Sequence, residues 1–111
     1  MSTTFNIGGV SLNSRFFLGT ALYPSPAVLA QAIEAAETDV ITVGLKRQLP
    51  AGANPLTQST TEGVDNPFFQ ILKQSGKHLL PNTAGCKTAR EAITLAHMAR
   101  EIFETHWIKL E

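Results

Sequence analysis

The sequence has little cysteine and no excess of either charge. Its single cysteine, Cys86, excludes an intrachain disulfide. Nine basic and nine acidic residues cancel, and no run of lysine or arginine could follow a phosphate backbone or an anionic membrane surface. No apolar stretch is long enough to cross a bilayer, and the first ten residues have neither the basic nor the apolar region of a secretion signal. We therefore expect a cytoplasmic protein that binds neither nucleic acid nor membrane.

Motifs for nucleotide and metal binding are also missing. The stretch FFLGTALYPSP contains neither the G-x-G-x-x-G pattern nor the P-loop pattern. His78, His97 and His106 do not have the spacing of metal ligands, and there is no second cysteine. We expect no cofactor and no metal, and histidines that are solvated or hydrogen-bonded.

The sequence does contain a regular alternation of strands and helices. Hydrophobic residues make up 43% of the chain, which is enough for a globular core. Two short apolar runs at residues 5–12 flank Gly8 and Gly9, which predicts a hairpin. The following segments predict, in order, a strand in RFFLGT, a helix in PAVLAQAIEAAET, a strand in DVITVGL, a helix in NPFFQILKQSG, a strand in HLLPNTAG, a helix in TAREAITLAHMAREIFE and a strand in THWIKLE.

Two details of this pattern lead to further expectations. Residues 46–66 are rich in Pro, Gly, Thr, Ser and Asn, which predicts a long functional loop. In the last helix, Thr88 and Glu91 have the spacing of a capping box. Its apolar periodicity predicts a buried face made of Ala89, Ala92, Ile93, Ala96, Ala99 and Phe103.

The order of elements predicts a parallel α/β fold, either an open sheet or a (β/α)₈ barrel. The missing glycine fingerprint favours the barrel.

The last predicted strand carries the main candidates for chemistry, Lys109 and Glu111. Side chains alternate along a strand, so these two would share one face with Trp107, while Ile108 and Leu110 would face the helices. Inside a barrel, burial disfavours a charged lysine, and a neutral amine can attack a carbonyl to form an imine. A carboxylate one pleat away could move the protons. The alternatives are an ion pair near the mouth of the sheet or two solvated residues on an edge strand.

Three further residues each leave two interpretations open. Cys86 lies just before a helix N-terminus, where a thiolate would be favoured, or it is a small loop residue without a chemical role. Lys46 and Arg47 end a strand at the side of the sheet where sites form, and they either hold an anionic group or lie in a solvated loop.

Taken together, LLPNTAG, the long helix after it and WIKLE resemble the N-terminal part of thiazole synthase, the enzyme that builds the thiazole ring of thiamin. FFLGTALYPS and DVITVGLKR match in the same order. The resemblance implies a (β/α)₈ barrel whose lysine, matching Lys109, forms a Schiff base with 1-deoxy-D-xylulose 5-phosphate. The acidic residue two places on matches Glu111. Dehydroglycine supplies the remaining ring atoms, and a sulfur-carrier protein with a C-terminal thiocarboxylate supplies the sulfur.

The resemblance implies that residues 1–111 are a single partial domain, because such barrels need about 250 residues. This domain would be the N-terminal half of a TIM-type barrel, preceded by a short hairpin at about residues 5–12 and ending within a strand at Glu111. The 111-residue chain would be inactive alone, because the phosphate-binding loops of the family are missing. We also expect a homo-oligomer. Two other hypotheses stay open. One is a different imine-forming barrel of the class I aldolase type, which needs no sulfur carrier. The other is a non-catalytic half-barrel that self-associates through its unpaired edge and incomplete core.

Overall fold

The computed structural model describes residues 4–48 and 67–111. The predicted loop at residues 46–66 falls largely outside this part, except that residues up to Gln48 form the end of a short helix. No helix in the described part is both long and apolar enough to cross a membrane. The elements are β1 (Phe5–Ile7), β2 (Val10–Leu12), β3 (Phe17–Leu18), α1 (Pro26–Ala36), β4 (Val40–Gly44), α2 (Leu45–Gln48), α4 (Pro67–Gln74), β5 (His78–Asn82) and α5 (Ala89–Phe103).

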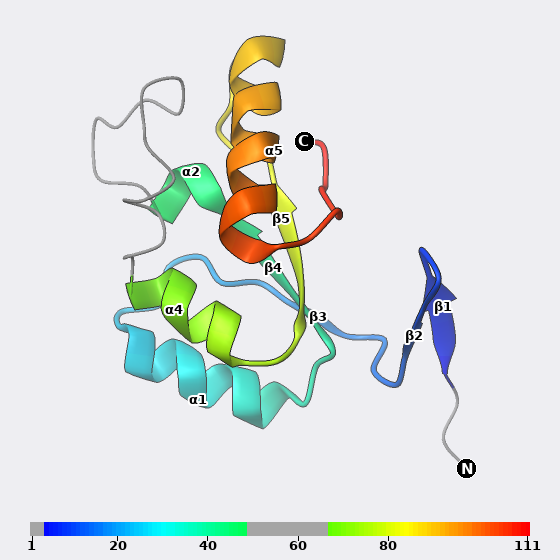
Figure 1. Ribbon diagram of the computed structural model, residues 1–111. Coiled ribbons are helices and arrows are strands. Elements are labelled where there is room, and N and C mark those ends of the chain that lie inside the picture. The colour runs from blue at the N-terminus through cyan, green and yellow to red at the C-terminus, as the bar shows by residue number, and fades with distance from the viewer. Residues whose placement is uncertain (1–3, 49–66) are drawn as a thin grey trace.

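The N-terminal hairpin forms as the sequence predicts. Strands β1 and β2 pair antiparallel, with Ile7 opposite Val10. Gly8 and Gly9 connect them with φ values of +56° and +81°, a conformation that glycine adopts without a steric penalty. The hairpin stands on the side of the main sheet that is opposite the helices (Figure 1).

The main sheet has the order β3-β4-β5, and both pairs of strands are parallel. Figure 1 shows α1, α4 and α5 on one side of it. Between the helices and the sheet lies one apolar core, which includes the edge-to-face ring pair of Phe69 and Phe103. Parallel strands joined by helices confirm the predicted α/β class and are compatible with a partial barrel. The largest fully buried members of the core are Leu29, Ile41, Val43, Leu45, Phe69, Leu72, Leu95 and Ile102.

The buried face of α5 agrees with the predicted one at Ala99 and Phe103 and differs from it elsewhere. Thr88 caps the helix by accepting a hydrogen bond from the Glu91 main-chain nitrogen, as expected. Ile93, however, is 60% exposed. The larger side chains of Leu95, Met98 and Ile102 pack against the sheet instead, because they bury more apolar area than alanines do. The buried residues of the helix are Leu95, Met98, Ala99, Ile102 and Phe103.

The predicted last strand is reduced to a single parallel bridge between Asn82 and Lys109. The Lys109 nitrogen donates to the Pro81 carbonyl, and the Thr83 nitrogen donates to the Lys109 carbonyl. The next bond toward the N-terminus would need a donor from Pro81, which has no N–H. The Trp107 nitrogen bonds to the Thr105 hydroxyl instead. The prediction of a full strand was therefore wrong within the described residues, although its register is present at Lys109.

Candidate functional site

A small hollow lies where β3, β4 and β5 end and the C-terminal segment crosses them. Its volume is about 190 Å³, below the roughly 300–1,000 Å³ of typical ligand pockets, so it suits one polar group of a substrate. The carboxyl ends of parallel strands are where α/β proteins place their sites. The lining residues are Gly19, Thr20, Ala21, Thr42, Gly44, Asn82, Lys109 and Glu111.

A larger hollow of about 510 Å³ opens between α1 and α4. It lies among the helices, away from the strand ends, and its charged residues are Glu34, Glu37 and Lys77. Since these side chains come from helix ends and the loop before β5, no strand end positions them. The smaller hollow is therefore the better candidate, because small residues leave space there beside a lysine and a carboxylate.

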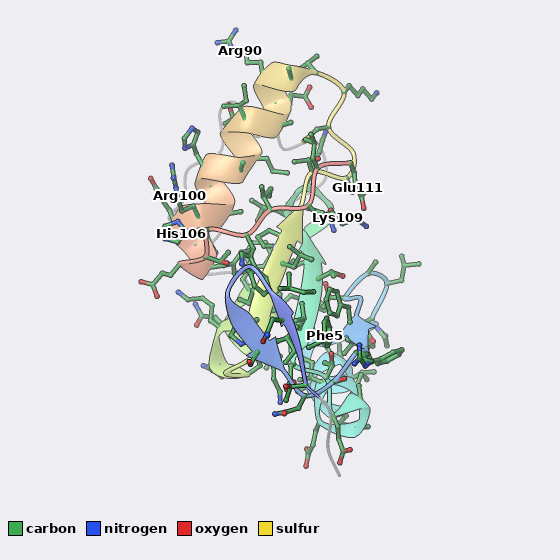
Figure 2. The ribbon with its side chains drawn as sticks, turned by 90° about the vertical axis from the view of Figure 1, so that its right-hand side faces the viewer. Phe5, Arg90, Arg100, His106, Lys109 and Glu111 are labelled. Atoms are coloured by element: carbon green, nitrogen blue, oxygen red, sulfur yellow. The ribbon has the colours of Figure 1, made fainter. Side chains whose placement is uncertain are left out.

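Lys109 and Glu111 lie side by side at the arrowhead end of β5 (Figure 2). The Lys109 Nζ atom is 2.8 Å from the Glu111 Oε1 atom, and their side chains are 55% and 35% exposed. The strand alternation therefore placed them on one face correctly. The expected burial of Lys109 is not found, because the hollow is walled by strands on one side only. The pairing fits both the catalytic interpretation and the ion-pair alternative.

Trp107, predicted on the same face, lies under the hairpin. Its ring stacks at a tilt on His78, with 5.7 Å between the ring centroids. A Cβ atom on Gly8 would come within 3.3 Å of the Trp107 indole nitrogen. Trp107 therefore helps to hold the hairpin against the sheet and does not line the hollow with Lys109.

Two residues of the site, Asn82 and Thr83, were not identified from the sequence. Asn82 lines the hollow, and its Oδ1 atom accepts a hydrogen bond from the Ala84 nitrogen. The Thr83 hydroxyl accepts a hydrogen bond from the Glu111 nitrogen at 2.8 Å. Both stand in LLPNTAG, directly where a predicted strand gives way to a turn, and polar residues at that point of a parallel sheet are a signal that could have identified them.

Lys46 does not lie in a solvated loop, because its side chain contacts two groups of the protein. Its ammonium donates to the Gly85 carbonyl at 2.7 Å and pairs with Glu91 at 3.1 Å. The hydrogen bond from Lys46, followed by that from the Lys87 nitrogen, holds the pKa of Glu91 below its usual range. The solvated-loop interpretation of Lys46 was therefore wrong, and the anion-binding interpretation stays a prediction. Lys46 ties α2, which directly follows β4, to the turn after β5. The side chain of Arg47 lies outside the described part.

The surroundings of Cys86 do not favour a thiolate. Partial burial raises the pKa of the Cys86 thiol, which favours the uncharged form over a thiolate. The ring of His97 is hydrogen-bonded to Arg100, as the sequence prediction allowed. In residues 4–48 and 67–111, no three His, Cys, Asp or Glu side chains are placed to hold a metal ion.

The fold and the site define an α/β protein with a lysine and a carboxylate at the carboxyl end of its parallel sheet. The family model for thiazole biosynthesis protein ThiG matches residues 6–111. The chain therefore belongs to the thiazole biosynthesis protein ThiG family.

Curated relatives named thiazole synthase are similar over nearly the whole chain. The protein of Agrobacterium fabrum is 50% identical over 103 residues, which are 93% of this chain and 36% of that protein. A Coxiella burnetii protein is 50% identical over 105 residues, 95% of this chain and 36% of its own length. The Erwinia tasmaniensis protein is 51% identical over 98 residues, which are 88% of this chain and 33% of that protein. The chain thus spans about a third of the length of these relatives.

Proposed function

We propose that this chain forms the part of a thiazole synthase that carries its Schiff-base lysine, Lys109, within a (β/α)₈ barrel. The observation that carries the proposal is the pair of Lys109 and Glu111 beside a hollow at the carboxyl ends of parallel strands. Membership of the thiazole family supports it. The substrates would be 1-deoxy-D-xylulose 5-phosphate and dehydroglycine.

In the proposed first step, the neutral amine of Lys109 attacks the ketone carbon of the sugar phosphate. The nitrogen forms a double bond to that carbon and the carbonyl oxygen leaves as water, so the imine retains every other substrate atom. Glu111 would then accept a proton from a carbon next to the imine and return it elsewhere during rearrangement. A substrate or further barrel strands over the hollow would exclude water. Because exclusion of water disfavours the charged form of a lysine, the neutral amine would form more readily.

The sulfur would come from a small carrier protein with a C-terminal thiocarboxylate. We propose a cytoplasmic homo-oligomer as the working form. We also propose that the 111-residue chain alone does not make thiazole, because it spans only 36% of the length of its relatives and walls the hollow incompletely.

The proposal is tested with a chimera in which residues 1–111 replace the matching segment of the Agrobacterium fabrum relative. Incubation with the ketose phosphate and borohydride should leave a stable adduct on Lys109, since reduction converts an imine to an amine. A Lys109→Arg chimera should form none. An adduct mapped to Lys46 or Lys87 would contradict the assignment. Thiazole formation that needs no thiocarboxylated carrier would favour an aldolase-type enzyme instead.

Self-association without catalysis is the second candidate. The observation that favours it is the apolar surface near the C-terminus, where Leu110 is 80% exposed and Ile108 is 40% exposed. Light scattering on the purified 111-residue chain would detect it as a mass above 12.0 kDa. A monomer at all concentrations would argue against this second function.

A further inference from the structure

We propose that Thr83 is a positioning residue that sets Glu111 beside Lys109; this inference rests on the proposed function of that pair. It is distinct from the pair itself, because Thr83 does not line the hollow and is 1% exposed. The Thr83 hydroxyl contacts the main chain of Glu111. Thr83 therefore influences the position of the Glu111 carboxylate without touching the substrate site.

The argument begins with how β5 ends. A parallel ladder that continued past Lys109 would have the Glu111 nitrogen donate to the Thr83 carbonyl. That carbonyl already accepts a hydrogen bond from the Cys86 nitrogen, in the turn that follows β5. The Thr83 hydroxyl takes its place and accepts from the Glu111 nitrogen at 2.8 Å. It also lies 3.3 Å from the main-chain oxygen of Glu111.

Thr83 therefore holds the last residues at two points with two different groups. Its main-chain nitrogen binds the Lys109 carbonyl at 3.2 Å, and its hydroxyl binds Glu111. Between these points Lys109 and Glu111 keep the alternation of a strand, which places both side chains on one face. Because a buried hydroxyl without a partner is unfavourable, the contact favours this one arrangement of Glu111.

Because the main chain of Thr83 binds Lys109 and its hydroxyl binds Glu111, loss of the hydroxyl should affect the two residues differently. Removing the hydroxyl leaves the main-chain bond to Lys109, so imine formation should continue. Glu111 would lose its anchor, and proton transfer depends on placement within about an ångström. A residue needed only for folding would affect imine formation and product formation together.

The variants are Thr83→Val, which keeps the shape and removes the hydroxyl, and Thr83→Ser, which keeps the hydroxyl. Thr38→Val is the matched control, because Thr38 is also buried and its hydroxyl donates to the Val40 carbonyl at the opposite end of the sheet. In the 111-residue chain, amide hydrogen exchange is measured by NMR. Thr83→Val should speed exchange of the Glu111 amide about five- to tenfold and leave exchange of the Lys109 amide unchanged. Thr83→Ser and Thr38→Val should not speed exchange of the Glu111 amide relative to that of the Lys109 amide.

In the chimera, Thr83→Val should lower kcat for thiazole formation about ten- to a hundredfold while borohydride trapping on Lys109 persists. Thr83→Ser should restore most of the loss. An unchanged Glu111 amide, or trapping and turnover that fall together in a folded variant, would overturn the inference. If the unaltered chimera forms no adduct on Lys109, the proposed function fails, and the exchange experiment alone decides whether Thr83 holds Glu111.

Discussion

The ammonium nitrogen of Lys109 lies 2.8 Å from a carboxylate oxygen of Glu111. Both side chains leave the same face of a segment that crosses the end of β5 (Figure 2). An ion pair this exposed adds little to stability, because water screens it. The catalytic interpretation and the ion-pair interpretation of Lys109 and Glu111 predict different results on substitution.

The first prediction concerns Glu111→Gln in the chimera, which keeps the size of the side chain and removes the base. Trapping of the imine on Lys109 should persist, while thiazole formation falls by about two to four orders of magnitude. Borohydride trapping and product formation are measured on the same preparation. Glu101→Gln, on the exposed side of α5, is the control and should change neither. If both quantities fall together in Glu111→Gln, the carboxylate acts mainly as a charge partner of Lys109.

Sequence reasoning located this pair because strand alternation is a local property. It needed only the two-residue spacing of Lys109 and Glu111. The contacts that hold the pair are long-range: Thr83 is 28 residues from Glu111 along the chain. Lys46 is likewise 45 residues from Glu91. No local pattern encodes which distant group completes such a contact, so the sequence did not predict the partners of Lys46.

The second prediction concerns the face of α5 that the sequence placed incorrectly. Leu95→Ala should lower the free energy of unfolding by about 2–5 kcal/mol, because Leu95 is fully buried in the core. Ile93→Ala removes a side chain of the same size from an exposed position and should cost less than about 1 kcal/mol. Urea unfolding of the two variants measures the difference. Equal losses would show that the predicted stripe is also buried.

The failure on α5 has a physical cause. In α5, one stripe is centred on Ala92 and Ala96 and an adjacent one on Leu95 and Ile102, while Ala99 is buried and lies between them. Periodicity alone does not choose between stripes that are a fraction of a turn apart. The hairpin, by contrast, was placed correctly, because Gly8 and Gly9 specify their own backbone conformation.

The third prediction concerns that turn. Gly8→Ala should lower the free energy of unfolding by about 1–2 kcal/mol from its positive φ alone, and by more because the added Cβ would lie 3.3 Å from the Trp107 indole nitrogen. Gly9→Ala is the matched control: its φ is also positive, but no atom lies within 4 Å of the added Cβ. Urea unfolding should therefore rank Gly8→Ala as the less stable variant. The same order in a Trp107→Ala background would argue against the indole contact as the cause.

The fourth prediction concerns the carboxylate of Asp39, which ties the segment after the hairpin to the start of β4. Its Oδ2 atom accepts hydrogen bonds from the main-chain nitrogens of Ser14, at 2.9 Å, and Asn13, at 2.6 Å. These two bonds hold the pKa of Asp39 below its ordinary value of 3.8. A carboxyl group whose pKa is lower in the folded protein stabilises the fold above its unfolded pKa, and this contribution is lost as the pH falls through the folded pKa.

Asp39→Asn keeps an oxygen acceptor and removes the charge, so it should lower the free energy of unfolding at neutral pH. The difference from the unaltered chain should shrink as the pH falls below about 4, because protonated Asp39 is then as uncharged as asparagine. Urea unfolding between pH 7 and about pH 2 follows this difference, with Glu34→Gln on the exposed side of α1 as the control. A difference that stays constant over this range would mean that the asparagine acts through shape or hydrogen-bond geometry. The charge of Asp39 would then not be what anchors the hairpin segment to β4.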